Sequence, residues 1–169
     1  MAIEAFLKRF IELLLAPRQN IEMIWIALPL ITSMILAELY FGRYNKEQLG
    51  WNTALSNSLV LVFVGLDLLK IHYSRGEFLV WNLDFSISLG ILIWGTLLLY
   101  LNFFHMMPER FAFMVSNFVP INMLAYLALA LVYADIPLDY FTIVSGAVLI
   151  GLVWLLFMIV HVIEPKAEV

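Results

Sequence analysis

The sequence predicts an all-α protein, a polytopic membrane helix bundle with about five transmembrane helices and an N-terminal amphipathic interfacial helix. The first supporting observation is composition: 64% of the 169 residues are apolar, 13% are charged, and the mean hydropathy is +0.97. Soluble domains contain ~45–50% apolar and ~25% charged residues. The second observation is that the apolar residues form long runs, each near the ~20 residues that a helix needs to cross a bilayer. The length fits one domain, residues 1–169.

The segment 1–18 is predicted to form a helix that lies in the membrane interface. Ile3, Phe6 and Phe10 recur at helical spacing and give it one apolar face, with charged residues opposite. Pro17 has no amide hydrogen and is predicted to end the helix. An alternative remains open, in which the helix of the first span begins early.

Five apolar segments follow, and each is predicted to cross the membrane. Short polar links that contain glycine or proline separate them, as turns require. Tyrosine and tryptophan residues gather near their ends, where amphipathic rings favour the headgroup layer. The predicted spans are about 21–41, 52–73, 81–106, 111–133 and 139–163.

Five spans place the two ends of the chain on opposite faces of the membrane. Five lysine and arginine residues then share the side of the N-terminus, and four share the other side: Arg43, Lys46, Arg110 and Lys166. Positively charged residues are enriched in cytoplasmic loops. This small excess predicts a multi-pass membrane protein with a cytoplasmic N-terminus.

The second span carries a carboxylate, Asp67, inside an apolar run. At 3.6 residues per turn, Asp67 shares about a quarter of the helix circumference with Thr53, Ser56 and Asn57. A charge inside a span costs about 2.5–3.5 kcal/mol on insertion scales. This polar stripe is therefore predicted to face protein or water, with Lys70 as one partner of Asp67.

The third span has a second carboxylate, Asp84, on one face with Ser88, Gly95 and Asn102. One interpretation is that Asp84 caps the N-terminus of this helix, where a carboxylate complements the helix dipole. The other is that it meets Asp67, because the two spans are antiparallel neighbours. Two carboxylates that meet would split their pKa values and could carry protons or act as acid and base.

The fourth span contains Asn117, Pro120 and Asn122. Pro120 removes a helical hydrogen bond and clashes with the carbonyl of Ser116, so a kink is predicted. Broken helices near the midplane are typical of transporter sites. Alternatively, Asn117 and Asn122 satisfy the freed backbone groups and bridge helices.

The remaining ionisable residues lie near the ends of spans. Glu38 is predicted to pair with Arg43, and His72, His105 and His161 are predicted to lie at the interface. The chain has no cysteine, and it has no phosphate-binding loop or nucleophile motif. We therefore expect no metal, no cofactor and no catalytic residues. The net charge of −4 gives no basic surface for nucleic acid.

The leading functional hypothesis is a non-catalytic subunit or scaffold of a membrane complex or homo-oligomer. Its expected partners are the lipid bilayer and either copies of the chain or other membrane subunits. A second hypothesis is a proton- or cation-coupled small transporter or channel that uses Asp67 and the kink at Pro120. A third is an intramembrane enzyme that uses Asp67 and Asp84. The candidate polar pathway consists of Asn57, Asp67, Asp84, Asn117 and Asn122.

Overall fold

The computed structural model of the chain describes residues 2–44, 50–78, 80–163 and 165, and the regular structure in these residues is entirely helical. The helices are α1 (Ala2–Gln19), α2 (Ile21–Arg43), α3 (Trp51–Ser74), α4 (Leu83–Phe103), α5 (Glu109–Val115), α6 (Phe118–Tyr133) and α7 (Tyr140–Ile163). Lys46 and Lys166, which enter the charge count, lie outside the described residues.

Five helical stretches are long and apolar enough to cross a membrane, which confirms the predicted number of spans. They are α2, α3, α4, the stretch Glu109–Tyr133 that contains α5 and α6, and α7. The third span is shorter than predicted at both ends. Asn82 begins it, because its side chain accepts a hydrogen bond from the amide of Phe85 (2.7 Å). The span ends before His105, where the chain turns through a positive φ of 52°.

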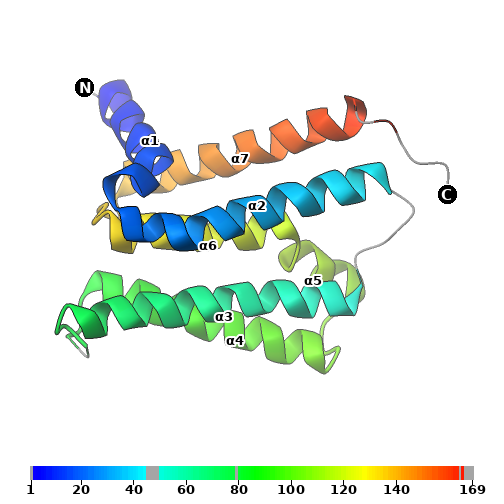
Figure 1. Cartoon of the computed structure of the whole chain (residues 1–169), viewed down its shortest axis with the longest axis horizontal. Coiled ribbons are helices and arrows are strands. Elements are labelled where there is room, and N and C mark those ends of the chain that lie inside the picture. The colour runs from blue at the N-terminus through cyan, green and yellow to red at the C-terminus, as the bar shows by residue number, and fades with distance from the viewer. Residues whose placement is uncertain (1, 45–49, 79, 164, 166–169) are drawn as a thin grey trace.

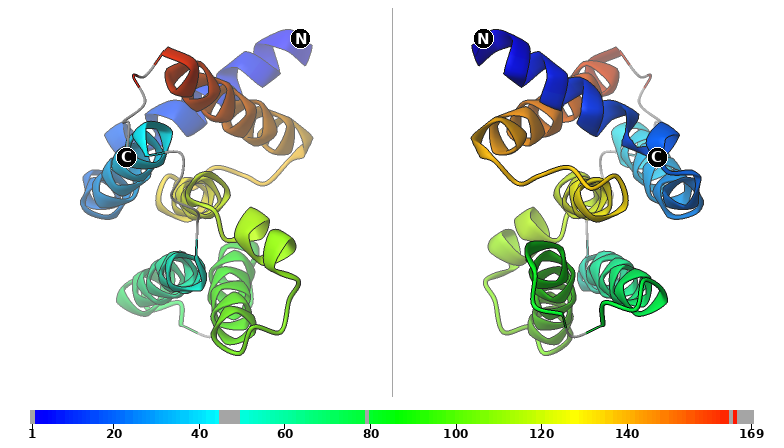
Figure 2. Two further views of the ribbon diagram at one scale, coloured as in Figure 1. Left: turned by 90° about the vertical axis from the view of Figure 1, so that its right-hand side faces the viewer. Right: turned by 90° about the vertical axis from the view of Figure 1, so that its left-hand side faces the viewer.

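Helix α6 is the centre of the bundle. Figures 1 and 2 show it between the α3–α4 hairpin on one side and α1, α2 and α7 on the other. The span that contains α6 has 67% of its most apolar stretch buried inside the protein, against 39% or less in the other four. Most residues of the other four spans therefore lie at least partly at the surface of the bundle, where a helix can contact lipid.

Two glycines let α3 and α4 approach closely. A Cβ atom added to Gly65 would lie 2.7 Å from the backbone of Leu92, and one added to Gly95 would lie 2.7 Å from the backbone nitrogen of Val62. Small residues at such crossings bring helix backbones together in membranes. The face of α4 that contains Gly95 therefore packs against α3.

Helix α1 does not end at Pro17, so that prediction is wrong. The helix continues to Gln19 with Pro17 inside it. Proline cannot donate to the carbonyl four residues before it, and the hydroxyl of Tyr126 on α6 donates to that carbonyl, of Leu13, instead (2.8 Å). The missing helical bond is thus replaced from a neighbouring helix, and Leu13 is fully buried at this contact.

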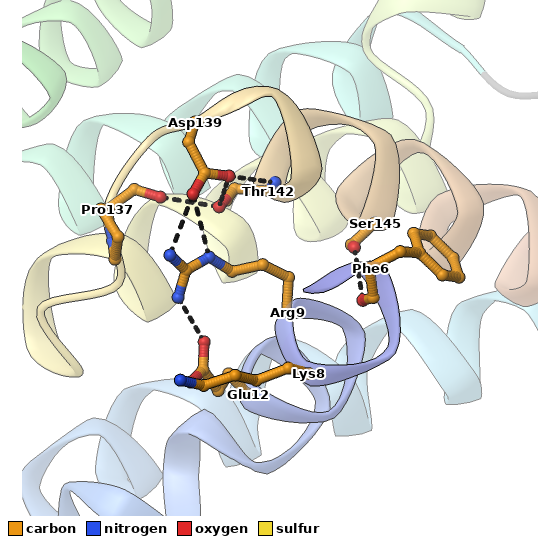
Figure 3. Close-up of polar contacts among 8 residues, drawn as sticks. All are labelled: Phe6, Lys8, Arg9, Glu12, Pro137, Asp139, Thr142 and Ser145. Carbon is orange, nitrogen blue, oxygen red and sulfur yellow. Dashed lines mark hydrogen bonds and ion pairs between the residues drawn. The ribbon is translucent and has the colours of Figure 1, made fainter. Parts of the chain in front are cut away.

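Helix α1 lies at an angle across the end of the bundle where α6 and α7 are connected (Figure 1), and it packs mainly on α7. Figure 3 shows the polar part of this contact. Arg9 donates to Asp139 (Nη2–Oδ2 2.9 Å) and to Glu12, and Ser145 donates to the carbonyl of Phe6 (3.3 Å). The hydrogen bond from Arg9 is the main cause that lowers the pKa of Asp139 to about 2, and the same bond raises the pKa of Arg9.

Candidate functional site

The fourth span is interrupted close to the position that Pro120 predicts. Helix α5 ends at Val115 and α6 begins at Phe118, so Ser116 and Asn117 lie between them. The carbonyl of Ser116 has no amide hydrogen to accept from Pro120. Asn57 on α3 donates to it instead, with Nδ2 2.7 Å from the oxygen. Asn57 is only 4% exposed, so this bond pairs a carbonyl that would otherwise be buried without a partner.

Asn102 on α4 extends this contact into a buried polar cluster. Its Nδ2 lies 2.8 Å from the hydroxyl of Ser58 and 2.8 Å from that of Ser116. Its Oδ1 is buried and lacks a partner within the part of the chain that the structure describes. The cluster, formed by Asn57, Ser58, Asn102 and Ser116, joins α3, α4 and the break in the fourth span. Ser58 was not among the predicted polar residues of α3. Ser56 was, but its side chain is exposed and donates within the same helix to the carbonyl of Asn52 (2.9 Å).

The other two asparagines of the predicted polar pathway act locally. Asn117 is the N-cap of α6, and its Oδ1 accepts from the amide of Phe118 (2.6 Å). Asn122 donates to the carbonyl of Phe118, one turn earlier in the same helix (2.8 Å). Within the described residues, no hydrogen bond joins either one to Asn57. The freed carbonyl at the kink is therefore satisfied by Asn57 rather than by Asn117 or Asn122.

Asp67 contacts α6 rather than α4. The hydroxyl of Tyr133, near the end of α6, donates to Asp67 Oδ2 (2.6 Å), and Lys70 lies 3.8 Å from Oδ1. The side chain of Asp67 is 21% exposed. Lys70 was predicted as a partner from its spacing. Tyr133 was not predicted, because it lies 66 residues further along the chain.

Asp84 neither caps its helix nor meets Asp67. Asn82 is the N-cap of α4, and Asp84 follows it in the first turn, where a carboxylate still complements the helix dipole. Within the described residues, no hydrogen bond or ion pair joins Asp84 to Asp67. The charged neighbours of Asp84 include Asp135 and Arg75 at the same end of the bundle.

His72, which was predicted to lie at the interface, is in the last turn of α3 and is fully buried inside the protein. Its Nε2 lies 3.1 Å from the hydroxyl of Ser88, and its ring packs edge-on against Phe85. Ser88 in turn donates to the carbonyl of Asp84 (2.8 Å). His72 therefore joins α3 to the first turns of α4.

A groove lies between α2, the break in the fourth span and α7. Its volume is about 760 Å³, and its polar lining comes from Glu38, Asn117 and His161. Glu38 was predicted to pair with Arg43, but it pairs with His161 instead. The Nε2 of His161 lies 3.5 Å from the carboxylate of Glu38 and 2.9 Å from its carbonyl. Helix α7 turns His161 toward α2, and this tertiary contact replaces the local pairing.

Apolar side chains form the rest of this groove. Four of them lie at helical spacing on one face of α7: Ile150, Trp154, Phe157 and Met158. Pro120 and Val119, at the start of α6, form part of the opposite wall. The groove thus brings the sequence-predicted residues Asn117 and Pro120 together with Glu38 and His161, a pair that no local motif indicates.

The described residues contain no group of three histidine, aspartate or glutamate side chains that could hold a metal ion. A comparison with protein-family models, curated proteins and solved structures finds no match to the chain. The chemistry of the chain is therefore argued from its own geometry. That geometry consists of one buried amide and hydroxyl cluster, the Asp67–Tyr133 contact, and the groove at Glu38 and His161.

Proposed function

We propose that this membrane protein is a non-catalytic subunit or scaffold, which assembles with copies of itself or with other membrane subunits. One observation carries the proposal: polar side chains of the spans are used to join helices. Asn57, Asp67 and Asn102 each bind a group from another helix of the same chain. Polar side chains that bond across helices in this way hold the helices of a membrane protein together.

The exposed apolar face of α1 supports the proposal that this end of the bundle contacts the membrane surface. The exposed apolar residues of α1 include four at helical spacing on one face: Ile3, Leu7, Ile11 and Leu14. An amphipathic helix with an uncovered apolar face binds the boundary between headgroups and acyl chains. We propose that α1 lies in this layer on the cytoplasmic face, with lipid against those four side chains.

A proton- or cation-coupled transporter remains the second candidate, and one observation favours it. The side chain of Asp67 keeps 21% of its surface exposed, near one end of α3. A carboxylate at this depth can exchange a proton or cation with water. An enzyme that uses Asp67 and Asp84 as a pair has no such support, because the two do not meet.

Purification in a mild detergent, followed by measurement of the mass of the complex, tests the proposal. We expect more than one protein chain per complex, either identical or including a foreign membrane protein in fixed ratio. In sealed liposomes, the purified protein should carry no proton or cation current above that of empty liposomes.

The variant Asp67→Asn separates the two candidates, because it preserves shape and removes the charge. For a scaffold, it weakens the bond from Tyr133 and lowers the thermal stability in detergent by roughly the 1.5–3 kcal/mol of a hydrogen bond to a charged group. A monomeric protein with an ion current that Asp67→Asn abolishes, at unchanged stability, would contradict the scaffold and favour the transporter.

A further inference from the structure

We propose that the groove between α2, the break in the fourth span and α7 binds one phospholipid that carries a primary amine in its headgroup. Its polar end is formed by Glu38, Asn117 and His161, and its apolar wall by the face of α7 that contains Trp154 and Ile150. The volume of about 760 Å³ falls within the ~300–1,000 Å³ of typical ligand sites.

The carboxylate of Glu38 gives the polar end its preference for a cation. This side chain is 12% exposed and opens into the groove. A carboxylate has about four acceptor positions, and in the described part of the chain its one ion pair is that with His161. A primary ammonium, with three donors, complements the remaining positions.

Two donors beside Glu38 suit the phosphate of the same headgroup. Asn117 uses its Oδ1 to cap α6, which leaves its Nδ2 without a hydrogen bond to any other described residue. His161 donates from Nε2 to the carbonyl of Glu38 beside the carboxylate, and its Nδ1, which the described residues do not engage, is a second donor in the imidazolium form of this ion pair. Donors beside a carboxylate match a headgroup in which a phosphate stands beside an ammonium.

The dimensions of the groove match one leaflet of a bilayer. His161 lies two residues before the end of α7, so the polar end is near the membrane surface. Ile150 precedes His161 by eleven residues, which corresponds to about 16 Å along a helix. Half of a hydrocarbon core of ~30 Å is nearly the same length. The apolar wall therefore runs from the headgroup level to the middle of the membrane, as one acyl chain does.

The test is a binding measurement by native mass spectrometry on the full-length protein in a mild detergent. The probes are dioleoyl phosphatidylethanolamine, dioleoyl phosphatidylglycerol and dioleoylglycerol, which share their acyl chains and differ in headgroup. Free ethanolamine is added as a competitor, to distinguish a lipid site from a site for a small amine. We expect phosphatidylethanolamine to bind about tenfold more tightly than the other two lipids, and ethanolamine not to displace it.

The variant Glu38→Gln should reduce this preference about tenfold. Glu22→Gln is the matched control, because it makes the same chemical change at an exposed residue of the same helix outside the groove, and it should leave lipid binding unchanged. Met158→Trp adds bulk in the groove at a side chain that is 44% exposed, so it should fold and should weaken binding of all three lipids.

Equal binding of the three lipids to the wild-type protein would overturn the proposal, and so would tight binding that Glu38→Gln does not alter. If Glu38→Gln does not fold, Met158→Trp decides: undiminished binding of phosphatidylethanolamine then places the lipid elsewhere and overturns it. Displacement by free ethanolamine would likewise show a site for a soluble amine and overturn the assignment to a lipid.

Discussion

The hydroxyl of Tyr126 lies 2.8 Å from the carbonyl of Leu13 and donates to it where Pro17 removes the helical donor. Tyr126 is on the central helix α6 and is 7% exposed, and Leu13 is fully buried. A tertiary hydrogen bond thus completes the backbone of α1. The contact makes α1 part of the bundle, although its sequence is that of a separate surface helix.

The first prediction is that Tyr126→Phe lowers the free energy of unfolding by about 1–3 kcal/mol, because a buried carbonyl loses its partner. The control is the same change in a Pro17→Ala background, where residue 17 regains an amide hydrogen for the carbonyl of Leu13. There the loss should be smaller, with a coupling of about 0.5–3 kcal/mol between the two sites. Unfolding of the four proteins in detergent measures this, and additive effects would contradict the role given to Pro17.

The second prediction concerns the buried amide of Asn57. Asn57→Ala should lower stability by about 1–3 kcal/mol, since the carbonyl of Ser116 would be buried without a donor. Asn52→Ala is the matched control, because Asn52 is on the same helix and is exposed, and its loss should cost less than about 0.5 kcal/mol. Thermal unfolding in detergent compares the two. Equal losses would show that the break in the fourth span does not depend on α3.

The third prediction concerns the effect of low pH on the docking of α1. The bond from Arg9 lowers the pKa of Asp139 to about 2, whereas an aspartate in an unfolded chain titrates near 3.9. This pair therefore stabilises the docked α1 fully above about pH 4, and the stabilisation is lost as the pH falls through about 2. Asp139→Asn should remove this acid dependence while keeping the cap on α7, because an asparagine oxygen can also accept from the amide of Thr142 (2.8 Å in the wild type).

Hydrogen exchange of the α1 amides between pH 2 and pH 6 measures this difference, after correction for the intrinsic exchange rate. Asp135→Asn is the control, because Asp135 lies in the same link and pairs with Arg75 rather than with α1. It should keep the acid dependence of the wild type. If the exchange of the α1 amides still rises at low pH in Asp139→Asn, a group other than Asp139 causes the acid dependence.

The fourth prediction compares two glycines of α4. Gly95→Ala should destabilise the protein, because its new Cβ would lie 2.7 Å from the backbone of α3. Gly90 has open space around it, so Gly90→Ala should stabilise the helix by up to about 1 kcal/mol. Opposite shifts of the unfolding midpoint in detergent are expected. A stabilising effect of Gly95→Ala would show that α3 and α4 pack less closely.

The spans could be predicted from the sequence because each depends on its own residues. A run of about 20 apolar residues needs no tertiary partner to be helical in a bilayer, because its backbone amides and carbonyls can hydrogen-bond only to one another there. The break in the fourth span could also be predicted, because Pro120 acts on the carbonyl of Ser116 in the same helix. The predicted end of α1 at Pro17 failed for the opposite reason, because the donor that replaces the lost bond belongs to α6.

The candidate site could be predicted only where its contacts are local. Lys70 was found from its spacing to Asp67, but Tyr133, the donor at 2.6 Å, is far along the chain. Glu38 was assigned to nearby Arg43, although the fold gives it His161 from the last span. Helical periodicity shows which face of a helix is polar, but it does not show which other helix covers that face.

The contacts that hold α1 have a consequence for biosynthesis. Arg9 and Asp139 are 130 residues apart, and Phe6 and Ser145 are 139 apart. At 5–20 residues per second, a ribosome needs about 7–26 s to make the intervening 130 residues. Helix α1 therefore waits, with the face that binds α7 uncovered, until α7 has been inserted. Docking of α1 is thus a late event in assembly, and it marks a chain whose insertion has reached α7.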